Sequence, residues 1–273
     1  MDNSGGCGQL GPGGLRRGRG DGAGASIGAV TPTRAPSPAA ALLDLLLPRT
    51  CGGCGAGPPG SGGWCPACAQ DTAGPVPVRV PGAGRVAAAG RYRGPLRRAV
   101  LAYKERGRRD LAPDLAGLLV GPVSAVLAPR ADGTPDPAAV RLVPAPSRPS
   151  AARVRGGDHV LRLCRALAPL LTASGLPART DAVLALHRRA RDSVGLDGAG
   201  RAANLASALH PARGREPVPA APGEAVLLVD DVVTSGATLR ACGAALAASG
   251  LPAVGAVVLA DASARRRLPG DRL

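Results

Sequence analysis

The sequence predicts an α/β protein in which a parallel sheet is flanked by helices and is preceded by a small module with four cysteines. From residue 140 onward, short runs rich in Val and Leu alternate with helix-length segments, as in βαβ units. One of these runs, residues 226–229, is apolar without alternation, which is typical of a strand buried on both faces. Two Cys-x-x-Cys pairs lie close together upstream, in Gly- and Pro-rich sequence.

Composition limits both the core and the possible partners. Hydrophobic residues make up 45% of the 273 residues but aromatic residues only 1%, so the core must be built from Ala, Val and Leu. The net charge of +15 comes almost entirely from Arg, and either a compositional bias or a polyanionic partner explains it. The scarcity of aromatic residues argues against a base-stacking platform for single strands.

Two absences and the cysteine usage indicate a cytoplasmic protein without membrane insertion. The sequence has no run of eighteen apolar residues and no apolar segment of the signal-peptide kind near its N-terminus. Four of the seven cysteines occur in pairs, which suits a reducing compartment and a metal site.

Three parts are expected along the chain. Residues 1–37 are Gly-rich and too weakly apolar to form a core, so we expect a disordered tail. Residues 38–75 form the cysteine module, which begins with a short apolar helix at 39–47. Residues 76–273 form the main α/β domain.

The cysteine module is predicted to bind zinc. Each Cys-x-x-Cys can aim two thiolates at one ion, and two such turns complete a tetrahedral site. A redox-active dithiol is the alternative, but that motif belongs near a βαβ unit. Trp64 is expected to shield the site. The proposed ligands are Cys51, Cys54, Cys65 and Cys68.

Within the main domain, strands and helices are expected in a simple order. Strands are predicted at 86–92, 140–143, 183–186, 226–229 and 254–259, and helices at 96–104, 111–127, 158–171, 201–208 and 239–249. The arginines at 97, 98 and 106 lie opposite the apolar face of the first helix, as a solvated face or a phosphate patch.

The most informative segment follows the strand at 226–229. Asp230 and Asp231 are expected at its carboxyl end, where open α/β sheets bind ligands. Gly236 allows close approach of the backbone, and the free N–H groups that begin the next helix can bind an anion. The alternative is a strand that ends in solvated acids before a capped helix.

This segment resembles the phosphoribosyl-pyrophosphate (PRPP) signature of type I phosphoribosyltransferases. With the cysteine pairs and several shorter motifs, the chain as a whole resembles the ComF/GntX family over about residues 39–261. The residues that carry the resemblance are Cys51, Cys54, Cys65, Cys68, Tyr92, Lys104, Val143, Pro144, Ala145, Pro146, Arg155, Gly156, Arg201, Asn204 and residues 226–238.

The resemblance implies a type I phosphoribosyltransferase-like fold and roles for particular residues. Asp230 and Asp231 would act at the ribose 2′- and 3′-hydroxyls. The residues implied in PRPP binding are Val232, Thr234, Ser235, Gly236, Ala237, Thr238, Pro144, Ala145, Arg153 and Arg155. Arg188, Arg189 and Arg191 would belong to a mobile hood, and Mg²⁺ would accompany the PRPP oxygens.

The chain departs from the family pattern at two places. The family usually has Arg-Gly-Phe-Asn-Gln where this chain has Arg-Gly-Gly-Asp-His at residues 155–159, and Ser193 stands where a Gln is common. His159, His187 and His210 are all interpreted as structural rather than catalytic.

Two classes of function remain open at this level. The protein is either a phosphoribosyltransferase that acts on an unidentified base or amine, or a non-catalytic accessory protein. The resemblance implies the second class through DNA uptake in competence, with single-stranded DNA or a helicase as partner. Fold alone does not decide between them.

Overall fold

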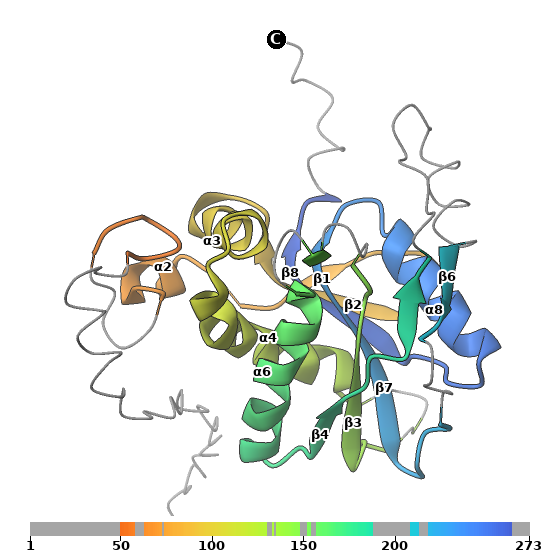
Figure 1. Cartoon of the computed structure of the whole chain (residues 1–273). Helices are drawn as coiled ribbons and strands as arrows, with labels where there is room; N and C mark the ends of the chain where they lie inside the picture. The colour runs from red at the N-terminus through yellow and green to blue at the C-terminus, as the bar shows by residue number, and fades with distance from the viewer. Residues whose placement is uncertain are drawn as a thin grey trace, which may run out of the picture. The chain divides into compact units, whose positions relative to one another are not determined.

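A six-stranded sheet forms the centre of the computed structural model (Figure 1). The structure describes residues 50–57, 63–72, 74–129, 133, 135–147, 152–153, 157–187, 208–212 and 218–263. The predicted tail at 1–37 and the predicted helix at 39–47 lie outside these residues, as does nearly all of the helix predicted at 201–208.

The sheet confirms the predicted fold class. Its strands are β1 (Val76–Val78), β2 (Arg85–Arg91), β3 (Ala139–Pro144), β4 (Ala178–Thr180), β7 (Glu224–Val233) and β8 (Gly255–Asp261), in the order β1-β2-β8-β7-β3-β4. Only the short edge strand β1 runs antiparallel to its neighbour; the other pairs are parallel.

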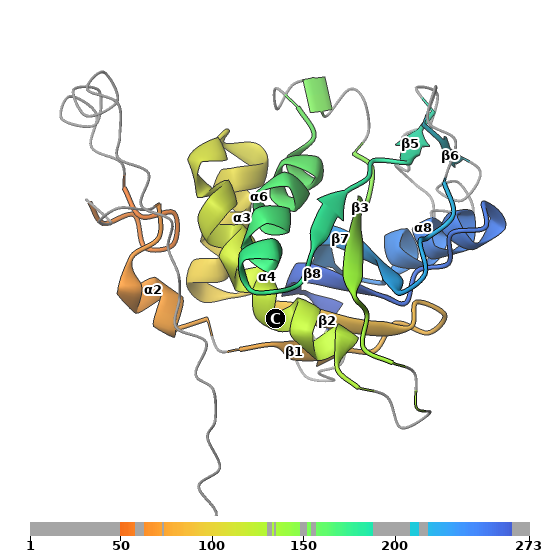
Figure 2. The same cartoon turned by 90° about the horizontal axis from the view of Figure 1, so that it is seen from below.

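Helices cover both faces of the sheet, as the two views in Figures 1 and 2 show. One face carries α3 (Gly94–Glu105), α4 (Ala112–Leu127) and α6 (His159–Ala173), and the other carries α8 (Ala237–Ala248). The short helix α2 (Pro66–Gln70) belongs to the cysteine module, and the 3-10 turn η1 (Arg109–Leu111) precedes α4.

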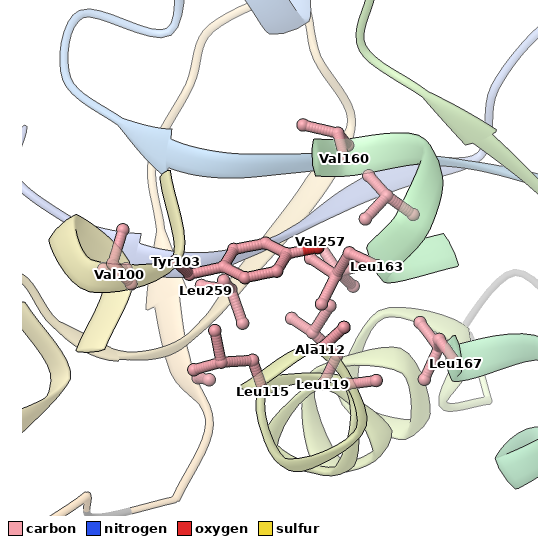
Figure 3. Close-up of a cluster of buried hydrophobic side chains, with 14 of the residues drawn as sticks. Val100, Tyr103, Ala112, Leu115, Leu119, Val160, Leu163, Leu167, Val257 and Leu259 are labelled. Atoms are coloured by element: carbon pink, nitrogen blue, oxygen red, sulfur yellow. The ribbon is translucent and has the colours of Figure 1, made fainter. Parts of the chain in front are cut away.

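Successive residues of β7 supply the two halves of the core. Leu227 and Val229 face α4 and α6, whereas Val226 and Leu228 face α8, because side chains alternate across a strand. On the first face, Tyr103 lies among leucines and valines from α4, α6 and β8 (Figure 3). Tyr103 fills the junction of three helices in a core built mainly from Ala, Val and Leu, as composition predicted; Trp64 belongs to the same cluster, and Tyr92 packs against it.

One core helix has the composition of a membrane span. The stretch Arg109–Leu127 is long and apolar enough to cross a membrane by length and composition alone. Its residues Leu111, Leu115, Leu119 and Val123 are fully buried in the cluster formed with the sheet and α6. In this structure it is therefore a helix of the domain core.

The strand predicted at 183–186 is found elsewhere than expected. Leu184–Leu186 forms β5, which pairs antiparallel with β6 (Leu209–Pro211) in a separate two-stranded sheet. The parallel strand that follows α6 in the main sheet is β4, which sequence patterning missed. Its residues Ala178–Thr180 are few and include an exposed Arg179, so no apolar run marks them.

The chain order creates a switch point between β3 and β7. From β3 the chain passes through α6 to β4 on one side, and from β7 it passes through α8 to β8 on the other. Ligands of open α/β sheets bind at such a point, beyond the carboxyl ends of the strands. A ligand site is therefore expected at the loops that follow β3 and β7.

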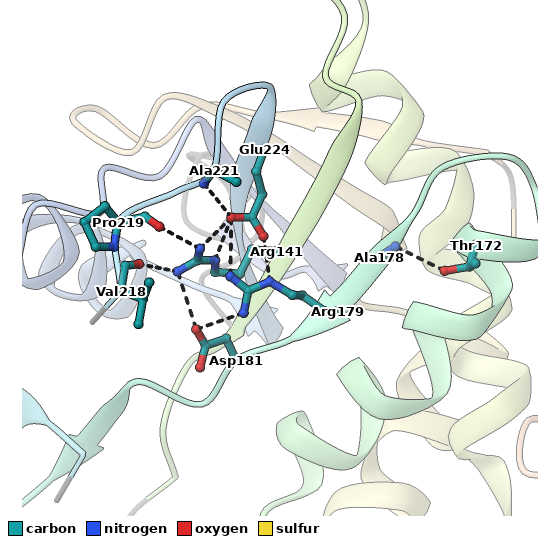
Figure 4. A network of polar contacts seen from close by, with 9 residues as sticks. All are labelled: Arg141, Thr172, Ala178, Arg179, Asp181, Val218, Pro219, Ala221 and Glu224. Atoms are coloured by element: carbon teal, nitrogen blue, oxygen red, sulfur yellow. Dashed lines mark hydrogen bonds and ion pairs between the residues drawn. The ribbon is translucent and has the colours of Figure 1, made fainter. Parts of the chain in front are cut away.

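A buried arginine of β3 binds neighbouring segments at this edge of the sheet (Figure 4). Arg141 is 1% exposed; it donates to the Glu224 carboxylate and to the carbonyls of Val218, at 2.6 Å, and Pro219, at 3.1 Å. Arg179 donates to the same carboxylate at 2.7 Å. Burial alone would raise the pKa of Glu224, but the hydrogen bonds from the two guanidinium groups outweigh it and lower the pKa to about 2.

Glu224→Gln should destabilise the domain at pH 7 by on the order of 3 kcal/mol, because it leaves Arg141 buried without its main countercharge. A carboxyl with a lowered pKa contributes stability above its unfolded-state pKa of about 4.3, and this is lost as pH falls toward the folded-state value. The difference between the variant and wild type should therefore shrink between pH 4.5 and 2.

Urea unfolding at several pH values measures this difference. Asp136→Asn is the matched control, because Asp136 is exposed. A difference that stays constant down to pH 2 would show that Glu224 acts by packing and not by charge.

Candidate functional site

The acids predicted at the end of β7 lie at the switch point, within the strand and not beyond it. β7 extends to Val233, so Asp230 and Asp231 are consecutive strand residues that point to opposite faces of the sheet. Asp230 is half-buried and Asp231 is 5% exposed. The two carboxylates are thus in different environments.

Asp231 is the centre of a buried polar cluster. Its Oδ2 lies 2.7 Å from Lys104 Nζ on α3 and 2.7 Å from His159 Nε2 on α6. Its Oδ1 accepts from the backbone N–H of Val232 at 2.6 Å. Burial alone would raise the pKa of Asp231, but the hydrogen bond from His159 and the positive charge of Lys104 hold that pKa well below its usual value. The group is an anion whose two oxygens are both engaged by the protein.

Asp230 is less engaged. Its Oδ1 accepts from the backbone N–H of Asp231 at 2.8 Å, and no described residue donates to its Oδ2. Burial, followed by the neighbouring Asp231 carboxylate, raises the pKa of Asp230. Of the two acids, Asp230 therefore has the oxygen that a ligand can reach.

His159 is a site residue that sequence analysis interpreted as structural. It is the first residue of α6, 4% exposed, and its ring joins Asp231 to Ser147, whose Oγ lies 3.3 Å from Nδ1. Its carbonyl accepts from the Tyr103 hydroxyl at 2.7 Å. The only signal in the sequence was the place of this histidine in the Arg-Gly segment, where the chain departs from the family pattern.

The loop after β7 has the features expected of an anion site. Thr234 and Ser235 are exposed, and α8 begins at Ala237 without a side-chain cap. Within the described part of the chain, the backbone N–H groups of residues 234–238 donate to no acceptor. These N–H groups precede or begin a helix of 12 residues, at the end where its dipole is positive.

Gly236 is required in this loop for two reasons. Its φ of 73° lies in the left-handed region, and a Cβ at this position would lie 2.3 Å from Val80 Cγ1. Val80 belongs to the connection between β1 and β2, so this connection packs directly under the loop.

The loop after β3 lies across the switch point from the loop after β7. Pro144 and Ala145 are buried, and the Ala145 N–H donates to the Val229 carbonyl at 2.8 Å. Ser147 N–H donates at 3.0 Å to Asp158, whose other oxygen caps α6 at Val160 and Leu161. A ligand therefore meets this loop beyond Ala145, at half-buried Pro146 and Ser147.

The remaining predicted site residues are placed as follows. Val232 is half-buried in β7, Ala237 and Thr238 are half-buried in the first turn of α8, and Arg153 is exposed. Arg155 and the arginines at 188, 189 and 191 lie outside the described residues, as do Ser193, Arg201 and Asn204.

The four predicted metal ligands come together. Their Sγ atoms all lie within 4.8 Å of one another, and those of Cys54 and Cys65 are 3.8 Å apart. Four sulfurs bound to one tetrahedral zinc at about 2.3 Å would be roughly 3.8 Å apart, so the cluster is compact enough to close around such an ion. The cysteines of the described chain are free thiols.

The environment of Cys51 also suits a thiolate ligand. Backbone N–H groups of Gly53 and Cys65 donate to its Sγ at 3.4 and 3.3 Å. Burial would raise the pKa of Cys51, but backbone hydrogen bonds outweigh it and lower that pKa to about 6. Trp64, which precedes Cys65 in the chain, is buried, and its indole N–H has no partner in the described chain. That Trp64 shields the site stays a prediction.

The cysteine module is attached to the helices of the first face. Arg98 of α3 donates to the Gly53 carbonyl, and Asp114 of α4 accepts from the Gly63 N–H at 2.9 Å. Leu111 lies against Gly52 and Gly63, where any Cβ would clash with it. Two of the arginines considered for a phosphate patch make contacts within the protein. Arg98 holds the cysteine module, and Arg97 Cζ lies 5.8 Å from the centroid of the Tyr92 ring.

A family model described as the phosphoribosyl transferase domain matches residues 179–271. The match contains β7, the loop after it and α8, and it begins after β3. It supports the phosphoribosyltransferase-like fold that the sequence predicted. The model describes the domain in general, so the more specific resemblance to the ComF/GntX family stays a prediction.

Several solved structures are also similar to this chain. An asparagine mutant from an analysis of an invariant aspartic acid in HPRTs is 19% identical over 61% of this chain and 71% of that chain, with a TM-score of 0.31. A hypoxanthine phosphoribosyl transferase from Trypanosoma cruzi, studied for its C-terminal region, is 19% identical over 61% and 70%, with a TM-score of 0.32. The Trypanosoma cruzi enzyme in complex with the product IMP is 20% identical over 62% and 72%, with a TM-score of 0.28. No curated protein matches the chain.

Gly236→Ala should both destabilise the domain and weaken anion binding, because the new Cβ adds a clash with Val80 to the strain of a left-handed residue. The strain of the left-handed backbone alone should lower the free energy of unfolding by about 1–2 kcal/mol. Gly250→Ala isolates that strain, because Gly250 has a φ of 72° and open space around its Cβ position.

Thermal and urea unfolding of both variants compare these effects. Gly236→Ala should be the less stable, and Val80→Ala should recover most of the difference when added to it. Equal stability of the two single variants would contradict the close packing of Val80 on the loop.

Proposed function

We propose that the protein binds PRPP with Mg²⁺ at the switch point between β3 and β7 and transfers its phosphoribosyl group to an acceptor. The observation that carries the proposal is the loop after β7: its N–H groups donate to no described acceptor, and they follow Asp230, whose Oδ2 accepts no hydrogen bond from the described residues. They belong to the stretch that matches the phosphoribosyl transferase domain.

The ligand groups are assigned to particular residues. The 5′-phosphate binds the N–H groups and hydroxyls of residues 234–238. Asp230 accepts hydrogen bonds from the ribose hydroxyls, and Asp231 acts behind it as a buried anion. The pyrophosphate lies at the loop after β3, with Arg153 and Arg155 as cations beside it.

The reaction is a displacement at ribose C1. A bond forms from an acceptor nitrogen to C1, the bond from C1 to the pyrophosphate oxygen breaks, and pyrophosphate leaves with the electron pair. The acceptor nitrogen then loses its proton to solvent or to a base. Fixed N–H donors and cations stabilise the leaving group, and Asp230 orients the ribose as positive charge develops on it.

Mg²⁺ would be bound mainly by the substrate. It keeps most of its waters and requires few protein ligands, and it neutralises pyrophosphate charge when bound. Asp230, whose Oδ2 accepts no hydrogen bond from the described residues, is the carboxylate available to it or to its waters.

The accessory function in DNA uptake is the alternative. One surface favours it: Arg93, Arg97 and Arg106 are exposed on or beside α3, and the net charge is +15. Single-stranded DNA bound there would depend steeply on salt. A helicase partner, a cytoplasmic location and the ComF/GntX assignment belong to the same proposal.

Zinc is the proposed metal of the four-cysteine cluster. Thiolate ligands in a tetrahedral arrangement are typical of closed structural zinc sites, in which the metal stabilises the fold and takes no part in chemistry. The ion would hold residues 38–75 as a small module that is attached through Gly53 and Gly63 to the domain at 76–273.

At a pH above its raised pKa of about 8, where Asp230 is ionised, Asp230→Asn should weaken PRPP binding by about 10- to 100-fold, because a charge-assisted hydrogen bond contributes about 1.5–3 kcal/mol. It should leave stability unchanged or slightly higher, since burial disfavours the charged form of this group. Asp231→Asn should instead lower stability strongly, because it removes the buried anion that Lys104 and His159 both contact.

Calorimetry with PRPP and Mg²⁺, together with thermal unfolding, measures both effects. Single-stranded DNA is titrated in parallel at two salt concentrations. A wild type that binds DNA but no PRPP would overturn the proposed function and favour the accessory role.

Cys54→Ser should abolish binding of one zinc per chain and loosen the module, because ligation and local folding are coupled. Metal analysis and limited proteolysis measure these effects. Cys242→Ser is the matched control, because this cysteine is buried in the α8 face of the core, away from the other four thiols. Purified wild type that is folded and metal-free would contradict the zinc site.

A further inference from the structure

A single imidazole bridges the two sides of the switch point. The Nε2 atom of His159 lies 2.7 Å from Asp231 Oδ2, at the end of β7, and its Nδ1 lies 3.3 Å from Ser147 Oγ, in the loop after β3. Because an ionised carboxylate only accepts, Nε2 donates to Asp231. In the neutral ring, Nδ1 then accepts the hydroxyl hydrogen of Ser147.

The ring is held firmly in this position. His159 is 4% exposed, its carbonyl accepts from the Tyr103 hydroxyl at 2.7 Å, and the Tyr103 ring meets it edge-on at 6.1 Å. Asp158 caps α6 and accepts from the Ser147 N–H. Ser147 is thus attached to the start of α6 both by its backbone and by its side chain.

The bridge determines what each side of the site can offer a ligand. Lys104 and His159 together occupy Asp231 Oδ2, which leaves Asp230 to meet the ribose. His159 holds the Ser147 side chain, while Asp158 holds its backbone. A pyrophosphate at ribose C1 would meet that loop, whereas a 5′-phosphate would meet only the loop after β7.

We propose that His159 is a positioning residue that couples the loop after β3 to Asp231 and thereby sets the preference of the site for PRPP over ribose 5-phosphate. This inference deepens the proposed function and rests on it. The residue acts through Ser147 and Asp231 and does not itself contact the ligand.

The test compares the affinities of PRPP with Mg²⁺ and of ribose 5-phosphate by calorimetry. His159→Leu removes both hydrogen bonds and should weaken PRPP binding by about tenfold or more while changing ribose 5-phosphate binding less than about threefold. His159→Gln should recover most of the lost preference, because a side-chain amide can both donate to Asp231 and accept from Ser147.

Two further variants separate positioning from general stability. Ser147→Ala removes only the hydrogen bond between Ser147 and His159, and it should lower the preference for PRPP over ribose 5-phosphate as His159→Leu does. The test therefore stays decisive even if His159→Leu fails to fold. Thr172→Ala loosens the far end of α6, where Thr172 Oγ1 accepts from the Ala178 N–H (Figure 4), and should not change the preference.

The outcomes are distinguishable. The positioning role would be overturned if His159→Leu weakened the binding of both ligands equally, or if His159→Gln did not recover the preference for PRPP. Either result would leave the proposed function intact. A wild type that binds neither ligand would overturn both. A selective loss of PRPP affinity in His159→Leu and Ser147→Ala, recovered by Gln, is the result expected.

Discussion

The buried carboxylate of Asp231 is the interaction on which the arrangement of this site depends. An ionised group that is 5% exposed is tolerated only where several donors surround it, and here Lys104, His159 and a backbone N–H do so. These donors come from α3, α6 and β7, so one charge fixes two helices against the central strand. Tyr103, the neighbour of Lys104, adds a hydrogen bond to the same unit. The accessible acid, Asp230, owes its position to this support.

Much of what lies in one continuous segment could be predicted from sequence. The strand at 226–229, the loop with Gly236 and the four-cysteine cluster all depend on near neighbours in the chain, so spacing and residue type were sufficient. The bond between His159 and Asp231 joins residues 72 positions apart and depends on how α6 packs on β7. No local pattern distinguishes such a histidine from one at an ordinary helix start. Similarly, β4 lacks an apolar run and is recognised only through its pairing with β3.

Several of the arginines that give the chain its positive charge form contacts within the protein. Arg141 and Arg179 share the Glu224 carboxylate, and Arg98 holds the cysteine module. These guanidinium groups connect segments of the chain, as expected of a planar donor with five N–H groups. Net charge alone therefore overstates the surface available to a polyanion. The arginines that remain exposed on or beside α3 include Arg93, Arg97, Arg98 and Arg106.

Helix α3 connects the two chemically distinct parts of the molecule. Near its start Arg98 donates to the Gly53 carbonyl, within the first Cys-x-x-Cys turn, and near its end Lys104 binds Asp231. Between them, Val100 and Tyr103 are buried against the core, which makes the helix a rigid unit. A cysteine module closed by a metal ion would hold the start of this helix, and the same helix carries Lys104, which together with His159 lowers the pKa of Asp231. A structural metal ion in the module would thus contribute to the order of the buried cluster around Asp231.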